Sequence, residues 1–513
     1  MPSLRALAEA DSLIPIRPGK IGKRPFWNRF AWQFIYAPAF EFARVKGAAG
    51  YRFHVRDRFG RDHVFRADSP DAPFTPVWRK LPVGPVFVDV DALDAKGRRI
   101  ASAGDRVFYR NAPFCGAYPG PACSYAECAR KAYDYLFRLP AVQGLAEGKI
   151  DPDYPLFCYP SKMLSSVING MISYAETDPK SADAAMRIAR GAAEHLIRTA
   201  VTAGPLENLP LTYAGKVLMS AGGEDTIMML FPAAVGQAML KLHEATGDAR
   251  YLAYARKIGD RYLHLQLPNG SWRLILRIAD GGPAEKNDCC PIAIMRFLEA
   301  LSRALKAKKY RAAADRALPF CQNMIDRFDW EGQFEDVAAQ RVPFQNLTKH
   351  NATDIYLYLA AIRPDDPEAR RGAREVQRFA EDQFIVWEQP GWAGAPELFK
   401  PRTLEALKVR NWGWHRWHTP CVLEQYRCYV PVDASSAKMI RYFLMLYDLE
   451  KDPLDLAKAR ALGDAVTRIQ CPDGRIPTWM DPARPPSEDW INCMFAAANA
   501  LKQWSGFDGV SCG

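Results

Sequence analysis

The sequence lacks the short signatures that would assign a class of site. Its twelve cysteines include no Cys-x-x-Cys pair, and several fall in apolar helical patterns, so the sequence predicts neither a zinc site nor a disulfide framework. A Ser-His-Asp signature, a Gly-rich phosphate loop, a Rossmann fingerprint and an HExxH motif are also missing from their required contexts. We therefore expect no cofactor and no metal.

No run of basic residues resembles a nucleic-acid-binding arm, although Lys and Arg outnumber Asp and Glu by 68 to 58. This scattered surplus is typical of an ordinary surface bias, and an anionic substrate is the alternative. Asp11, Pro15 and Pro18 interrupt the first 24 residues, which lack the apolar run of a signal peptide or a membrane span. We expect a soluble protein without nucleic-acid or membrane partners, cytoplasmic as written, or secreted or periplasmic if a leader was removed.

The length of 513 residues, with 49% hydrophobic and 25% charged residues, is typical of a globular chain with more than one domain. The pattern of hydrophobic and turn-forming residues changes twice along the chain. We expect an N-terminal extension over residues 1–33, a β-rich module over 34–115 and a helical domain over 116–513.

Short β-rich runs separated by turn residues occupy about residues 34 to 110. In the run PVFVDVDAL, residues 85–93, three valines alternate with bulky or acidic residues, which predicts a strand with one buried face. The alternating residues are Val86, Val88 and Val90 against Phe87, Asp89 and Asp91. The segment resembles a fibronectin type III or immunoglobulin-like module, which implies a small β-sandwich that either binds a ligand or acts as a spacer.

Beyond Ser124 a helical hairpin recurs about every 60 residues, and each copy leaves through a loop that bears Gly and Trp. Five copies begin near Cys158, Glu224, Asn287, His350 and Asp433. The helix expected at 489–504 has no successor, and the one at 124–138 has no predecessor. Pairing them would close a ring and remove its exposed ends. We therefore expect a mostly α fold, an (α/α)6 toroid preceded by the small β-sandwich, with an open solenoid as the alternative.

In such a ring the loops that lead into the apolar helices converge on one mouth. Four of the five loops place an acid near the helix start, and the fifth places His350 there. N-capping explains any single acid of this kind, because Asp, Asn and Ser accept hydrogen bonds from free amides at helix starts. Glu224, Asp225 and Asp288 stand out because they lie on adjacent hairpins beside aromatic or basic loops. We predict that they flank one glycosidic bond.

The insertion KVRNWGWHRWHTPCVLEQYRCY, residues 408–429, is the densest cluster of aromatic and basic residues. Indole rings stack on sugar faces, and guanidinium groups grip carboxylates. We predict that it binds an acidic saccharide, with a loop that merely packs over the rim as the alternative. The predicted binding residues are Arg410, Trp412, Trp414, Arg416, His418 and Tyr426, with Trp272 and Trp490 from other hairpin loops as further subsites or packing residues. His415 and His418 with an acid could instead bind a metal, and calcium is another open alternative.

The repeated hairpins, their Gly/Trp loops and the acids at the apolar-helix starts resemble the six-hairpin glycosidase superfamily, which includes unsaturated glucuronyl hydrolases and (α/α)-barrel β-glucuronidases. The resemblance covers about residues 124–505 and rests on architecture, since no family motif matches residue by residue. It implies a glycoside hydrolase that removes glucuronic-acid-type residues from an acidic oligosaccharide or polysaccharide. Asp225 and Asp288 would then be acid and base or nucleophile, with Glu224 as a competitor.

Two other functions stay open. A polysaccharide lyase or uronate epimerase on a similar toroid would need a base and a group that neutralises the uronate. His350, His415 or His418 with Tyr426 would supply the first, and Arg410 or Arg416 the second. A non-catalytic glycan-binding protein would keep the aromatic residues, and its acids would only cap helices. The sequence also leaves homo-oligomerisation open.

Overall fold

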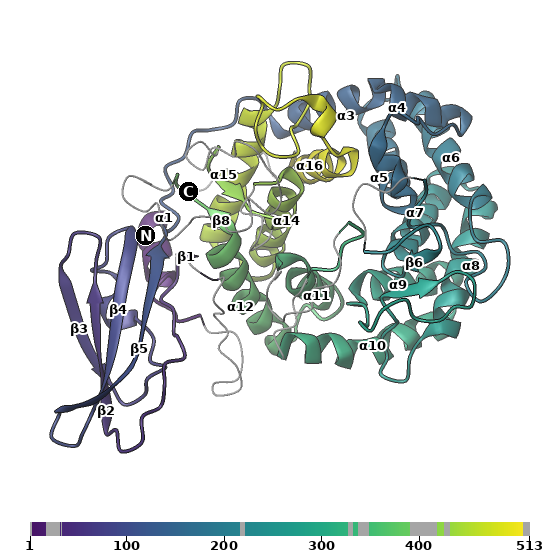
Figure 1. Ribbon diagram of the computed structural model, residues 1–513. Helices are drawn as coiled ribbons and strands as arrows, with labels where there is room; N and C mark the ends of the chain where they lie inside the picture. Colours follow the sequence, from purple (N-terminus) through teal and green to yellow (C-terminus); the bar gives the residue numbers. More distant parts are fainter. Residues whose placement is uncertain are drawn as a thin grey trace.

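The computed structural model describes residues 3–16, 31, 33–215, 221–326, 332–336, 348–389, 418–424 and 431–505. Over these residues the chain forms a short N-terminal helix, a five-stranded sheet and a ring of helical hairpins (Figure 1). Within the same residues, no helix combines the length and the apolar character that crossing a lipid bilayer requires.

The ring is built from antiparallel helix pairs. The pairs are α5 (Pro160–Thr177) with α6 (Ala182–Arg198), α7 (Phe231–Thr246) with α8 (Ala249–Leu265), α9 (Ile292–Leu305) with α10 (Lys308–Asp326), α11 (Lys349–Ile362) with α12 (Pro367–Phe384), and α14 (Asp433–Glu450) with α15 (Pro453–Ile469). Short elements flank these pairs. Before α5 lie α4 (Pro140–Gln143) and the 3₁₀ turns η1 (Gly144–Glu147) and η2 (Pro155–Cys158), and after α15 lies the 3₁₀ turn η3 (Pro486–Glu488).

The ring is closed by its first and last described helices. α16 (Ile491–Trp504) packs along α3 (Tyr125–Arg138), and the Tyr133 hydroxyl donates to Oδ1 of Asn499 at 2.6 Å. The helices α5, α7, α9, α11, α14 and α16 each contact the next, and α16 contacts α5, so these described helices form a complete inner circle (Figure 1). The predicted (α/α)6 toroid and its closure are confirmed.

Glycines set the spacing of neighbouring inner helices. A Cβ atom added to Gly170 of α5 would lie 2.0 Å from the ring of Phe495 on α16. One added to Gly236 of α7 would lie 2.3 Å from the ring of Phe297 on α9. Because each glycine receives an aromatic ring from the next helix, the inner circle closes without voids at these two contacts.

The sheet precedes the ring and has the order β1-β5-β4-β2-β3, with β1 parallel to β5 and the other pairs antiparallel. Its strands are β1 (Gln33–Phe34), β2 (Gly50–Arg56), β3 (Asp62–Ala67), β4 (Gly84–Leu93) and β5 (Arg99–Arg110). In β4 the three valines are buried, whereas Phe87 and Asp89 are exposed. The predicted alternation along this strand is confirmed.

Aromatic residues outside the strands cover the buried face of the sheet. Phe74 and Trp78 come from the start and end of the short helix α2 (Thr75–Trp78), and Phe40 comes from the preceding segment. The Phe40 and Phe74 rings lie 5.5 Å apart, and each contacts the ring of Phe108 on β5. Over the described residues this module has one sheet and no second sheet that packs on it. The resemblance to a fibronectin type III or immunoglobulin-like sandwich is therefore not confirmed.

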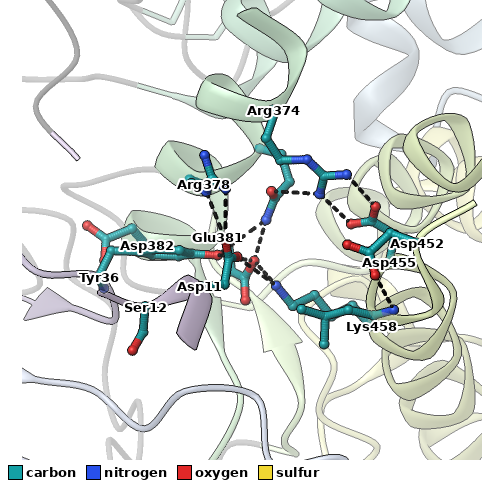
Figure 2. Close-up of polar contacts among 12 residues, drawn as sticks. Asp11, Ser12, Tyr36, Arg374, Arg378, Glu381, Asp382, Asp452, Asp455 and Lys458 are labelled. Atoms are coloured by element: carbon teal, nitrogen blue, oxygen red, sulfur yellow. Dashed lines mark hydrogen bonds and ion pairs between the residues drawn. The ribbon is translucent and has the colours of Figure 1, made fainter. Parts of the chain in front are cut away.

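A buried polar network joins the N-terminal helix α1 (Leu4–Asp11) and the sheet to the outer wall of the ring (Figure 2). Arg378 of α12 donates to Oδ1 of Asp11 at 2.8 Å, and Lys458 of α15 donates to Oε2 of Glu381 at 2.7 Å. The Tyr36 hydroxyl lies 2.9 Å from both Asp11 and Glu381. Residues 3–11 are thus part of the contact surface between the module and the ring.

Asp382 of α12 anchors the chain that enters the sheet. Its Oδ1 accepts hydrogen bonds from the amides of Ile35 at 2.5 Å and Tyr36 at 2.9 Å. Burial raises the pKa of Asp382 to about 8, against the lowering effect of these hydrogen bonds. The side chain therefore holds a proton at neutral pH.

Candidate active site

The inner helices all run in the same direction, because each returns through an outer helix before the next one begins. Their starts therefore surround one mouth of the ring, and their free amides contribute partial positive charge there. The residues at these starts are Pro160, Phe231, Ile292, Lys349, Asp433 and Ile491. Anionic groups are stabilised at such a position.

Glu224 and Asp225 do not cap α7. The short strand β6 (Thr226–Met228) follows them, pairs with β7 (Ile275–Arg277), and delays the helix start to Phe231. Both acidic side chains are exposed. Glu224 accepts a hydrogen bond from the Gly215 amide, so its carboxylate is held against its own approach loop.

Asp288 lies just before α9, and both of its carboxylate oxygens have partners in the segment between α8 and α9. Arg273 donates to Oδ1 at 2.8 Å, and the Asn269 amide donates to Oδ2 at 2.8 Å. The backbone oxygen of Asp288 accepts from Gln333 at 3.0 Å, which holds the segment 332–336 beside the start of α9. No described contact joins the carboxylates of Asp225 and Asp288, and their catalytic roles stay predictions.

A second acidic pair, Glu335 and Asp336, lies at the mouth. The side chain of Glu335 is fully buried and forms an ion pair with Lys162 of α5. Its backbone oxygen accepts from Ala221 at 2.9 Å and from the Tyr213 hydroxyl at 3.1 Å. Its Oε2 is buried without a partner among the residues that the structure describes, and such an atom is normally satisfied by a bound polar group.

The neighbouring Asp336 is half-buried. Burial and the adjacent Glu335 carboxylate raise the pKa of Asp336 to about 6, with a further contribution from Glu424 and an opposing one from Lys162. A carboxyl group with this pKa still carries a proton in part of the molecules at neutral pH. It has the property that a general acid requires.

Glu424 also lies at this mouth, just after the strand β9 (Cys421–Val422), which pairs with β8 (Ile385–Val386). Its Oε1 lies 3.3 Å from Nε2 of His350, and its Oε2 accepts from the Ser435 hydroxyl. Lys349 places its Nζ 3.7 Å from Oε2. Although burial raises the pKa of Glu424, Lys349, His350 and Ser435 outweigh it and hold this pKa well below its ordinary value.

His350 is the predicted site residue that the structure brings into this cluster. Burial and the charges of Lys349 and Lys438 lower the pKa of His350 to about 4. The imidazole is therefore neutral at physiological pH and can accept a proton. Its ring packs edge-on against Phe334, with the ring centres 5.6 Å apart.

Asp433 lies behind Glu424 at the start of α14 and is fully buried. Its Oδ1 accepts from the Ala434 amide at 2.6 Å, while its Oδ2 has no described partner. Burial raises the pKa of Asp433 well above its ordinary value, and the charges of Asp489 and Glu424 add to this effect. A neutral Asp433 contributes a hydrogen-bonding group to the mouth without adding negative charge.

The two tryptophans predicted to bind sugar occupy different environments. Trp490 is half-buried at the start of α16, where it stacks on Tyr159 and lies 4.4 Å from Nζ of Lys162. Trp272 is fully buried, and its Nε1 donates to the backbone oxygen of Tyr262 at 2.8 Å. Because no solvent reaches Trp272, its ring is a packing element and not a subsite, which corrects the expectation for this residue.

Most of the predicted aromatic and basic insertion falls outside the described residues. His418 is described and exposed. All other predicted site residues of the insertion lie outside the described residues: Arg410, Trp412, Trp414, His415, Arg416 and Tyr426.

Sequence reasoning missed Glu335, Asp336 and Glu424. The first two follow the Gly-bearing loop DWEGQF, at the exit of the hairpin that contains α9 and α10. Loops that leave an outer helix end at the same face of the ring as loops that enter an inner helix. The sequence signal was therefore an acid in such an exit segment. A search limited to helix starts does not include these segments.

No family profile matches the chain, and no curated protein matches it. Solved structures do match it. A family 76 glycoside hydrolase from a bovine Bacteroides thetaiotaomicron strain is 13% identical, with 91% of this chain and 95% of that chain covered and a TM-score of 0.48. Cellobiose 2-epimerase from Spirochaeta thermophila DSM 6192 is 14% identical over 70% and 88%, with a TM-score of 0.49. An unsaturated glucuronyl hydrolase specific for heparin is 11% identical over 75% and 98%, with a TM-score of 0.45. At these values the similarities assign no reaction to this chain.

Proposed function

We propose that this protein is a carbohydrate-active enzyme, a glycoside hydrolase that acts on an acidic glycan with Asp336 as general acid and Glu424 as base or nucleophile. One observation carries the proposal: two carboxyl groups of the same mouth have pKa values pushed in opposite directions, Asp336 upwards and Glu424 downwards. Glycoside hydrolysis needs one protonated and one ionised carboxyl group across the scissile bond.

In this mechanism the protonated Asp336 donates its proton to the glycosidic oxygen as the bond to the sugar breaks. The ionised Glu424 then either activates a water molecule or attacks the anomeric carbon. His350 and Ser435 hold the Glu424 carboxylate by hydrogen bonds, so they fix its orientation. The exposed part of the half-buried Trp490 ring offers a contact surface for a sugar beside Lys162.

The uronic-acid specificity, the contribution of residues 408–429 and the catalytic roles of Asp225, Asp288 and Glu224 rest on the sequence pattern alone. We carry the first two as part of the proposal and keep the roles of Asp225, Asp288 and Glu224 as the alternative to Asp336 and Glu424. The partial positive charge of the six described helix starts around the mouth supports an acidic substrate.

A polysaccharide lyase or uronate epimerase is the second candidate, and the neutral His350 favours it. A neutral imidazole 3.3 Å from Glu424 can accept the proton from the carbon next to a uronate carboxylate. Glu424 would then stabilise the imidazolium that forms.

Product analysis on a panel of uronic-acid-containing and neutral oligosaccharides tests these functions. New reducing ends without ultraviolet absorbance would support hydrolysis, and absorbance from an unsaturated uronate would support a lyase. Deuterium uptake from heavy water without bond cleavage would support an epimerase. Substrate binding with none of these signals would contradict an enzymatic function and favour a glycan-binding protein.

A further inference from the structure

Cationic side chains gather on the inner helices below the mouth. Lys241 is on α7, Arg296 on α9, and Lys438 and Arg441 are one turn apart on α14. Arg296 and Lys438 are half-buried, whereas Lys241 and Arg441 are exposed. Each of these helices is backed by outer helices and flanked by inner neighbours, so we place its accessible polar residues on the side of the toroid axis. At a rise of about 1.5 Å per residue, Lys438 and Arg441 lie about 7 and 12 Å below the start of α14.

Asp354 of α11 is the carboxylate in contact with this group. Lys438 places its Nζ 2.6 Å from both oxygens of Asp354. Arg296 donates to the backbone oxygen of Asp354 at 3.0 Å and lies 3.9 Å from Oδ1. Although burial raises the pKa of Asp354, Lys438 and Arg296 outweigh it and hold this pKa at about 2. Asp354 is therefore ionised and supplies one negative charge.

The remaining positive charge has no partner among the described residues. Arg296, Lys438 and Arg441 together face only Asp354, which leaves an excess of two positive charges. Arg441 and Lys241 form no hydrogen bond or ion pair with any residue that the structure describes. Burial and the charge of Arg296 lower the pKa of Arg441, against the opposing effect of Asp354. Burial and the charges of Arg441 and Lys502 lower the pKa of Lys241, against the opposing effect of Glu176 and Glu244. Like charges held close together repel one another, and an anion that binds between them relieves this repulsion.

We propose that Arg441, Arg296 and Lys438 form an oxyanion site on the axis of the toroid, distinct from Asp336 and Glu424. Guanidinium groups bind planar or tetrahedral oxyanions through paired hydrogen bonds. The inference rests on the proposed function in one respect, the identity of the anion. That identity is the carboxylate of a uronic acid whose ring lies at the mouth. A free inorganic oxyanion has the same chemistry, so the test separates the two sources.

The test measures binding of free glucuronate, glucose and sodium sulfate to the full chain by titration calorimetry at constant ionic strength. None of these three compounds has a glycosidic bond, so their binding does not depend on hydrolysis. The binding result can therefore be interpreted even if the proposed function fails. The variant is Arg441→Gln, which removes a charge without breaking a described ion pair. The matched control is Arg187→Gln on the exposed surface of α6, where Arg187 also has no described partner.

We expect glucuronate to bind at least about tenfold more tightly than glucose, and Arg441→Gln to remove this difference while Arg187→Gln keeps it. Sulfate that competes with glucuronate would assign both to the same site. Binding of sulfate alone, weakened in Arg441→Gln, would keep the oxyanion site and assign it to a free ion. If Arg441→Gln folds with an unchanged melting temperature and binds glucuronate and sulfate as the wild type does, the proposal is wrong.

Discussion

Nε2 of His350 lies 3.3 Å from Oε1 of Glu424, while the Ser435 hydroxyl donates to the other oxygen of the same carboxylate. Each oxygen of Glu424 thus has a donor from a different inner helix, α11 or α14. This arrangement favours the ionised form of the carboxylate.

Ser435→Ala removes one of these donors, so we expect the pKa of Glu424 to rise. A charge-assisted hydrogen bond contributes about 1.5 kcal/mol or more, which corresponds to about one pKa unit. The acidic limb of the kcat/KM profile should move to higher pH by about that amount. Ser436→Ala is the matched control, because Ser436 bonds to Met480 and not to Glu424. A limb that stays in place, or moves equally in the control, would contradict the role of Ser435.

Asp336→Asn should lower turnover by about two to four orders of magnitude, since general acid catalysis contributes roughly that factor. In the wild type the protonated form acts, so kcat/KM should fall as pH rises through about 6, the pKa of Asp336. The variant should lose this basic limb. Initial rates between pH 4 and 9 measure both effects, and an unchanged profile would remove Asp336 from the mechanism.

Asp288→Asn and Asp225→Asn test the pattern of acids at helix starts directly. If those acids carry the reaction, each variant should lose turnover as Asp336→Asn does. The partners of the Asp288 carboxylate lie in the segment between α8 and α9, away from Asp336 and Glu424 in the described contacts, and Asp225 is exposed. We therefore expect both variants to keep turnover within about threefold of wild type. Rates of the three purified variants on one substrate decide between the two sets of acids.

Trp490→Ala and Trp272→Ala should separate binding from stability. Loss of the half-buried Trp490 ring should raise KM by about two- to thirteenfold, because a stacking surface is worth about 0.5–1.5 kcal/mol. Loss of the fully buried Trp272 ring should cost about 3–5 kcal/mol of stability and leave KM unchanged. Thermal unfolding and steady-state kinetics distinguish the outcomes, and Trp272→Phe is the milder variant if Trp272→Ala does not fold.

Asp382 should make stability depend on pH. Its pKa is about 8 in the folded chain and about 3.9 in an unfolded one, so the folded state binds the extra proton between these values. Stability from this group is complete below about pH 4 and is lost as pH rises through 8, by at most about 1.4 kcal/mol per pH unit. Asp382→Asn should flatten this part of the unfolding curve while its side-chain oxygen still accepts from Ile35 and Tyr36. An equal slope in the variant would contradict the assignment.

The fold could be predicted from the sequence because each hairpin repeats the same apolar period. Neighbouring units that bury one face on each other need only periodicity and loop length, and both are local properties. The unmatched helices at the two ends then implied closure. The β-rich segment was harder, because alternation in β4 specifies one buried face without specifying what covers it. Here Phe40, Phe74 and Trp78 cover it, and they lie outside the strands.

The candidate site could be predicted only in part, because its chemistry depends on contacts between distant segments. His350 was found since it lies at a helix start. Glu424 is 74 positions from His350 along the chain, and Glu335 is 173 positions from Lys162. An acid gains a raised or lowered pKa from neighbours of this kind, so no local pattern could single out Asp336 or Glu424.

The hydrogen bond between Tyr133 and Asn499 spans 366 positions. A ribosome must therefore complete nearly the whole helical region before α3 meets its partner, and until then the apolar flanks of α3, α5 and α14 that α16 covers are open to water. Such a high contact order predicts slow final assembly and a need for protection from aggregation during synthesis. The start of α16 also positions Trp490 at the mouth, so the mouth of the nascent chain is incomplete before α16 forms. We expect the nascent chain to be inactive until residue 504 has left the ribosome.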